Sequence, residues 1–223
     1  MTDSAKKPPS NGDDTSCRTE EQQQKVLSIQ ILFTFNKIDR IPYDFNSILF
    51  QINEVLALIS PIPDKLAAKH YSNESISRYL ISQKWNVQKA SKMMNESFKW
   101  RLQYKPEEIR WEHIAYEAEL GKIYRLNFED KQGRTVLVMR PRFQNSKSIE
   151  SQMKYLVYCM EKAIMNREEM IWLVDFNGFT ASNISLKLAR RTTYILQNYY
   201  PQRLATAILY DPPNIFEPFW KVT

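Results

Sequence analysis

One apolar run, Met170-Ile171-Trp172-Leu173-Val174, most restricts how this chain can fold. Five apolar residues in succession predict a strand buried on both faces, and such strands belong to parallel sheets that helices cover. Helical patterns flank the run, over residues 148–164 before it and from Ser182 or Asn183 to Tyr199 after it. This alternation of strands and helices predicts an α/β fold.

Three further strands complete the expected sheet. Residues 122–129 and 135–139 are separated by Asp130-Lys131-Gln132-Gly133, a turn sequence, so together they predict a hairpin. Residues 204–210 form the last strand, after the helix stop at Pro201. We expect a mostly parallel sheet whose last strand has little chain after it to supply a neighbour.

Residues 52–119 predict a small helical lobe that precedes the sheet. Apolar residues there recur at helical spacing, and we expect them to form a core: Ile76, Tyr79, Leu80, Val87, Ala90, Met93, Met94 and Phe98. At Gly121 the spacing of apolar residues changes from a helical to a strand pattern, so we expect the α/β domain to begin near residue 120. We expect it to continue to residue 223.

The first 51 residues fall into two parts. Residues 1–25 are polar and predict a disordered tail. Residues 26–51 hold neither helical nor strand periodicity, and they begin with Val and end with Gln, whose codons can supply the GT and AG ends of a retained intron. We therefore interpret 26–51 as an in-frame insertion from altered splicing. The alternative is an ordinary strand or helix of an N-terminal extension.

Several classes of function are disfavoured by the composition. The 4 glycines are too scattered for a phosphate-binding loop or a nucleophile elbow, and two distant cysteines make no metal cluster or disulfide framework. We expect no catalytic residues, no metal and no cofactor. The polar start and the short apolar run at 26–35 predict a cytoplasmic protein without a signal peptide or a membrane span.

Basic residues are concentrated in one part of the chain. Residues 76–142 carry 14 Lys and Arg against 8 Asp and Glu, which accounts for the net charge of +6. An anionic membrane, a phosphorylated headgroup and a nucleic acid are all compatible partners, and so is a solvated helical face without a partner.

Several ordered motifs carry a resemblance to a known family. They are Ile76-Ser77-Arg78-Tyr79-Leu80, Trp85-Asn86-Val87, Lys99-Trp100-Arg101, Trp172 to Phe179, Gln197 to Leu204, and Pro213-x-x-Phe216-x-x-x-Trp220. Over residues 52–222 the chain resembles the CRAL-TRIO lipid-binding family, in particular plant members related to the yeast phosphatidylinositol/phosphatidylcholine transfer protein. The resemblance implies that an α/β sandwich lobe holds one lipid in an apolar pocket and transfers or presents it between membranes, without catalysis.

The resemblance also implies site residues. Headgroup contacts fall on Gln83, Lys84, Gln202 and Arg203. The pocket residues are Trp172, Val174, Tyr199, Ile208, Tyr210, Phe216 and Trp220, although the aromatic ones fit core or interface packing equally well. The family has a basic residue where this chain has Gln83 and an acidic one where it has Gln202. Both departures weaken the selection of phosphatidylinositol.

The family's further strand and gating helix would follow Trp220, whereas this sequence ends at Thr223. We therefore expect a C-terminally truncated variant, with an incomplete sheet lobe and impaired lipid retention. The expected partners are a phospholipid and, transiently, a membrane surface, and the expected state is a monomer. The alternative function is a basic module that binds nucleic acid or an anionic membrane without lipid transfer, with Tyr79, Trp85, Trp100 and Tyr104 as its aromatic residues.

Overall fold

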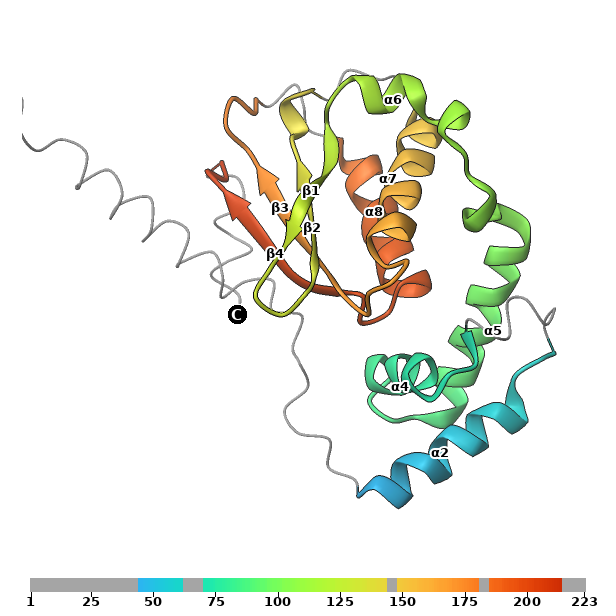
Figure 1. Cartoon of the computed structure of the whole chain (residues 1–223). Helices are drawn as coiled ribbons and strands as arrows, with labels where there is room; N and C mark the ends of the chain where they lie inside the picture. Colours follow the sequence, from blue (N-terminus) through green and yellow to red (C-terminus); the bar gives the residue numbers. More distant parts are fainter. Residues whose placement is uncertain (1–43, 62–69, 144–147, 181–184, 214–223) are drawn as a thin grey trace, which may run out of the picture.

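The computed structural model describes residues 44–61, 70–143, 148–180 and 185–213. Its helices and strands are α2 (Phe45–Leu58), α4 (Asn73–Ser82), α5 (Val87–Tyr104), α6 (Ala115–Glu119), β1 (Ile123–Glu129), β2 (Thr135–Met139), α7 (Ile149–Ala163), β3 (Met170–Asp175), α8 (Leu186–Tyr199) and β4 (Leu204–Tyr210). Short 3₁₀ helices are η1 (Pro106–Glu108), η2 (Trp111–His113) and η3 (Pro141–Phe143). The helical lobe comes first and the sheet second, as predicted (Figure 1).

Some expectations concern residues outside these ranges. The polar tail 1–25, the greater part of the segment 26–51, and the pocket residues Phe216 and Trp220 are among them. The expected missing strand and gating helix concern chain beyond residue 213, which also lies outside the described residues.

Helix α2 begins earlier than the sequence pattern indicates. Asp44 caps it, because its carboxylate accepts a hydrogen bond from the Ser47 backbone N–H at 2.7 Å. The helix then runs through Ile52, so the expected boundary between residues 51 and 52 falls inside one continuous helix. Its periodicity is weak because apolar residues lie on its solvent side as well, with Phe45 72% and Phe50 63% exposed.

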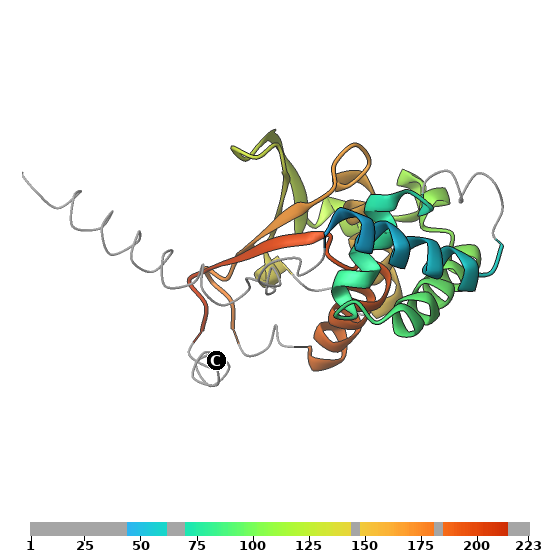
Figure 2. The ribbon, with the colours of Figure 1, turned by 90° about the horizontal axis from the view of Figure 1, so that it is seen from below.

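Helices α2, α4 and α5 pack together and group on one side of the molecule, beside the sheet (Figure 2). Side chains cap α4 and α5 as well: Ser72 accepts from the Ser75 N–H, and Asn86 accepts from the Lys89 N–H. The predicted apolar stripe forms a separate core, which consists of Ile52, Val55, Ile76, Tyr79, Leu80, Trp85, Val87, Ala90, Met93, Met94 and Phe98.

The described sheet has the order β1-β2-β3-β4. The hairpin β1–β2 is antiparallel, and the pairings β2–β3 and β3–β4 are parallel. The predicted strands at 135–139 and 204–210 are confirmed at both ends, and the apolar run is confirmed as a strand between two parallel neighbours.

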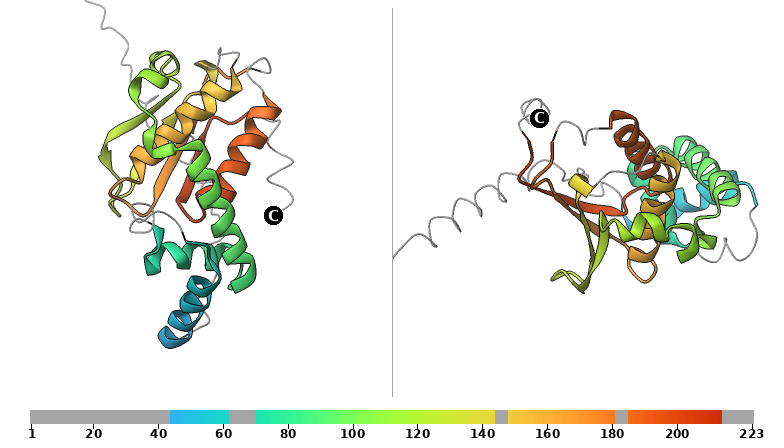
Figure 3. Two further views of the ribbon diagram at one scale, coloured as in Figure 1. Left: turned by 90° about the vertical axis from the view of Figure 1, so that its right-hand side faces the viewer. Right: turned by 90° about the horizontal axis from the view of Figure 1, so that it is seen from above.

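Helices α7 and α8 lie on one face of the sheet (Figure 3). Leu137, Trp172 and Ala207 are paired across β2, β3 and β4 and belong to the core that includes the apolar side of α7. Ile195 and Leu196 of α8 complete this covered face.

The opposite face, which we call the second face, is also apolar. Its residues are Val136, Val138, Ile171, Leu173 and Ile208, because successive side chains of a strand point to opposite faces. Val136, Val138 and Ile171 are buried, yet they belong to none of the three hydrophobic clusters that the described residues form. Within the described ranges, no helix covers the second face (Figure 1), although three of its five side chains are buried.

Candidate functional site

Two of the predicted headgroup residues line one cavity between the lobes. This interlobe cavity has a volume of about 370 Å³ and is lined by Ser82, Gln83, Met93, Leu196, Gln197, Asn198, Tyr200, Pro201, Gln202 and Leu204. Gln83 directly follows α4, and Gln202 lies in the turn between α8 and β4. The fold therefore joins residues that are far apart in the sequence.

The lining of the interlobe cavity is uncharged and partly polar. It includes four side-chain amides, those of Gln83, Gln197, Asn198 and Gln202. Each amide both donates and accepts hydrogen bonds, so together they suit hydroxyl and ester oxygens. The Ser82 hydroxyl donates to the Tyr79 carbonyl at 2.8 Å, the Gln83 amide to the Met93 sulfur at 3.1 Å, and the Asn198 amide to the Tyr194 carbonyl at 2.8 Å.

The backbone is unusual at both sides of this cavity. Lys84, Trp85 and Gln202 have φ angles of 52°, 63° and 55°, in the left-handed region that residues other than glycine seldom adopt. The turn after α4 is held by a 2.7 Å hydrogen bond from the Trp85 N–H to the Leu80 carbonyl. These turns present Gln83 and Gln202 to the cavity.

The two charged residues predicted for the headgroup, Lys84 and Arg203, have different surroundings. Lys84 is exposed and does not line the interlobe cavity. Arg203 donates to the Glu168 carbonyl at 2.8 Å and to its carboxylate at 3.1 Å, and Arg78 pairs with the same carboxylate. Burial and the charge of Arg78 lower the pKa of Arg203 to about 10, which still leaves it charged at neutral pH.

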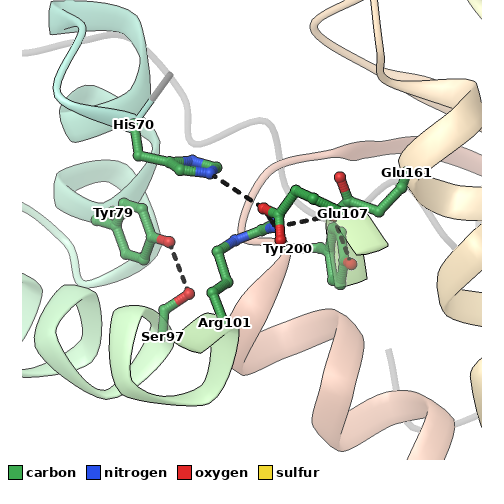
Figure 4. Close-up of polar contacts among 7 residues, drawn as sticks. All are labelled: His70, Tyr79, Ser97, Arg101, Glu107, Glu161 and Tyr200. Atoms are coloured by element: carbon green, nitrogen blue, oxygen red, sulfur yellow. Dashed lines mark hydrogen bonds and ion pairs between the residues drawn. The ribbon is translucent and has the colours of Figure 1, made fainter. Parts of the chain in front are cut away.

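A buried polar network lies behind Tyr200 and joins the lobes (Figure 4). Arg101 of α5 donates to Glu107 at 2.6 Å and to Glu161 of α7 at 2.9 Å, and the Tyr200 hydroxyl donates to Glu161 at 2.7 Å. His70 lies 3.7 Å from Glu107. No sequence motif predicted this network, although an arginine on the buried stripe of α5 is a signal that could have indicated it.

Charges inside this network shift its pKa values. Burial disfavours the Arg101 cation, but Glu161 and Glu107 outweigh it and raise the pKa of Arg101. Burial and Glu161 raise the pKa of the Tyr200 hydroxyl. Arg101 is therefore a permanent cation that holds two carboxylates.

The predicted pocket residues fall in separate places. Trp172 and Val174 pack in the core beneath α7 and α8. Tyr199 stacks on Trp100 of α5, with ring centroids 4.3 Å apart, and so lies at the contact between the lobes. Ile208 and Tyr210 alternate with Ala207 and therefore belong to the second face.

No helix within the described ranges is long and apolar enough to cross a membrane.

In a comparison with known proteins, residues 118–223 match the family model of the CRAL/TRIO domain. A CRAL-TRIO domain-containing protein of Schizosaccharomyces pombe, C23B6.04c, is 31% identical over 156 residues, which are 68% of this chain and 15% of that protein. Phosphatidylinositol transfer protein PDR17 of Saccharomyces cerevisiae is 31% identical over 168 residues, which are 68% of this chain and 48% of that protein.

Among solved structures, that of Sfh5 superposes with a TM-score of 0.58 at 13% identity, covering 81% of this chain and 76% of that one. This likeness supports the fold. The chain spans less than half the length of the two curated relatives named above.

Proposed function

Because residues 118–223 match the CRAL/TRIO domain, we propose that this protein binds one phospholipid molecule and transfers or presents it at membranes. The relative PDR17 is named a phosphatidylinositol transfer protein, and this supports a cargo of the phosphatidylinositol or phosphatidylcholine class. The proposed role is carriage rather than catalysis, in the cytoplasm and with transient contact to membranes.

The second face of the sheet is the observation that carries this proposal. Val138, Leu173 and Ile208 lie side by side on three neighbouring strands, with Val136 and Ile171 beside them. Acyl chains laid on such a surface gain about 0.8 kcal/mol for each CH₂ group removed from water. Two chains can therefore be retained by burial alone, without a reactive residue.

The interlobe cavity is the proposed position of the headgroup. Gln83 and Gln202 supply amide donors and acceptors there, and Arg203 follows Gln202 in the same turn. Amides bind hydroxyl groups and phosphate ester oxygens without requiring a particular net charge. This lining suits inositol and choline phosphodiesters alike.

The alternative, a basic module that binds nucleic acid, receives less support from the geometry. Tyr79 and Trp85 are buried in the helical core, and Trp100 is stacked between Tyr104 and Tyr199. Six of the 14 basic residues in 76–142 lie within 3.4 Å of a carboxylate: Arg78, Arg101, Lys105, Lys122, Arg134 and Arg142. Base stacking and phosphate contacts both need side chains that are free.

The proposal is tested by lipid capture and transfer. The purified protein is incubated with donor vesicles that contain labelled phosphatidylinositol or phosphatidylcholine, then re-isolated and offered unlabelled acceptor vesicles. We expect wild type to capture lipid and deliver it. The variant Ile208→Glu places a charge on the second face and should lower capture by at least about tenfold, because an unpaired charge in an apolar site is costly.

A matched variant makes this result specific. Leu102→Glu introduces the same charge at a leucine of α5 that is 44% exposed, and it should capture lipid like wild type. Capture of neither lipid by the folded wild-type protein, or equal capture by Ile208→Glu and wild type, would contradict the proposal.

A further inference from the structure

A second cavity lies at the opposite end of the sheet lobe from the interlobe cavity, and its lining includes Val174, one of the predicted pocket residues. This carboxyl-end cavity has a volume of about 130 Å³ and is lined by Lys122, Ile123, Met139, Arg140, Pro141, Gln152, Met153, Leu156, Val174, Leu188 and Thr192. Met139 ends β2, and Val174 lies next to the end of β3. The cavity therefore lies where parallel strands end, on the face that α7 and α8 cover, and it shares no lining residue with the interlobe cavity.

The wall of the carboxyl-end cavity is apolar. Six of its residues are aliphatic or thioether side chains: Ile123, Met139, Met153, Leu156, Val174 and Leu188. An engineered apolar cavity of about 150 Å³ holds a benzene molecule, so a cavity slightly smaller has room for a chain of about six carbons.

The guanidinium of Arg140, at the wall of this cavity, is only partly hydrogen-bonded. Arg140 donates through Nη2 to the Tyr124 hydroxyl at 2.8 Å, and its Nε has no hydrogen-bond partner among the described residues. Its nearest carboxylate is that of Asp175, 3.7 Å from Nε, and Arg142 holds that carboxylate more closely, at 2.8 Å.

The other charged groups around Arg140 do not neutralise it. Two arginines share the single carboxylate of Asp175. Lys122, which also lines the cavity, is paired with the buried carboxylate of Glu117. An apolar cavity with one partly satisfied guanidinium beside it matches an amphiphile with a short tail and a single negative charge.

We propose that the carboxyl-end cavity is a second ligand site, which takes a medium-chain monocarboxylate of the fatty-acid class. Its alkyl chain fills the space between the sheet and helices α7 and α8, and its carboxylate binds Arg140. This site lies on the covered face, whereas the proposed phospholipid site lies on the second face. The two proposals can therefore fail independently.

The test measures binding of octanoate to the full chain by isothermal titration calorimetry, beside 1-octanol, which has the same tail without the charge. We expect saturable octanoate binding by wild type. Leu188→Trp, at a half-buried residue of α8, should fill the cavity and abolish the binding of both probes. Arg140→Gln should weaken octanoate about tenfold and leave 1-octanol unchanged, since it removes a charge-assisted contact alone.

Two controls separate this site from other surfaces. Arg190→Gln removes an exposed charge from α8 and should leave octanoate binding unchanged. Ile208→Trp changes the second face and should also leave it unchanged. The proposal is overturned if wild type shows no saturable binding, if Leu188→Trp binds like wild type, if Arg140→Gln binds octanoate like wild type, or if Ile208→Trp removes binding as Leu188→Trp does.

Discussion

Arg101 is almost completely buried, with 3% of its side chain exposed, and it faces two carboxylates from different parts of the fold. Transferring an ion from water into the interior costs several kcal/mol, which only good geometry and complete hydrogen bonding offset. Here Nη1 of the guanidinium reaches both Glu107 and Glu161, and the Tyr200 hydroxyl also donates to Glu161, while the buried Nε of Arg101 has no hydrogen-bond partner among the described residues. The stability of the network therefore depends on every member being present.

Glu107 makes this network sensitive to acid. Burial opposes ionisation of Glu107, but the hydrogen bond with His70 and the charge of Arg101 outweigh it and lower its pKa from 4.5 to about 2. A carboxylate whose pKa is depressed in the folded state contributes stability above its unfolded pKa, and that stability is lost as the pH falls through the folded pKa.

We expect the melting temperature of Glu107→Gln to lie below that of wild type at pH 7. The difference should shrink between about pH 4.5 and pH 2, since protonation removes the same charge from wild type. Melting curves of both proteins across this range give the measurement. A difference that stays constant down to pH 2 would show that the Glu107 charge adds nothing to stability.

At the scale of elements, the contact between α5 and α8 is aromatic. Trp100 and Tyr199 stack with ring planes 6° apart, and Tyr104 stacks on the Trp100 ring at a centroid distance of 4.9 Å. Tyr194 meets Tyr199 edge-on. Tyr199, which the resemblance implied for the lipid pocket, thus packs a helix of one lobe against a helix of the other.

A double-mutant cycle measures this contact. Trp100→Ala, Tyr199→Ala and the double variant are compared with wild type by urea denaturation. We expect a coupling energy of about 0.5–1.5 kcal/mol, the range for aromatic pairs beyond their burial. The pair Leu102→Ala and Tyr199→Ala is the control, for which we expect additive effects. Additivity of Trp100→Ala and Tyr199→Ala would mean that the stack does not hold the helices together.

For the whole molecule, the important fact is that two separate apolar cores are joined through a polar network and an aromatic stack. The helical core holds Trp85, and the core beneath the sheet holds Trp172. Arg101 lies between them and contacts residues of both lobes. We infer that the two lobes unfold as one cooperative unit.

Arg101→Met tests this cooperation, because it leaves Glu161 buried without its cation. Loss of one partner of a buried ion pair costs about 3–5 kcal/mol. We expect the ¹⁹F NMR signals of Trp85 and Trp172, in protein labelled with fluorotryptophan and so retaining Trp100, to report the same loss in urea denaturation. Arg191→Met, at an exposed pair with Glu150, is the control and should cost less than about 1 kcal/mol. Separate transitions for the two reporters in the Arg101 wild-type background would contradict the inference.

Most elements of this fold could be predicted from the amino-acid sequence. The strands at 135–139 and 204–210 and the helix after Asn86 follow from apolar periodicity and from turn and capping residues, which act between neighbours in the chain. The start of α2 was not predicted, because apolar residues lie on both sides of that helix and weaken its helical periodicity.

Which residues lie together could be seen only in the folded chain. Trp172 and Ile208 lie on opposite faces of the sheet, whereas Gln83 and Gln202 line one cavity. Arg101 pairs with Glu161, which is 60 residues away in the chain. The carboxyl-end cavity likewise exists only where β1, β2, β3, α7 and α8 meet. The physical reason is that periodicity depends on adjacent residues, whereas burial, charge pairing and cavities depend on segments that folding brings together.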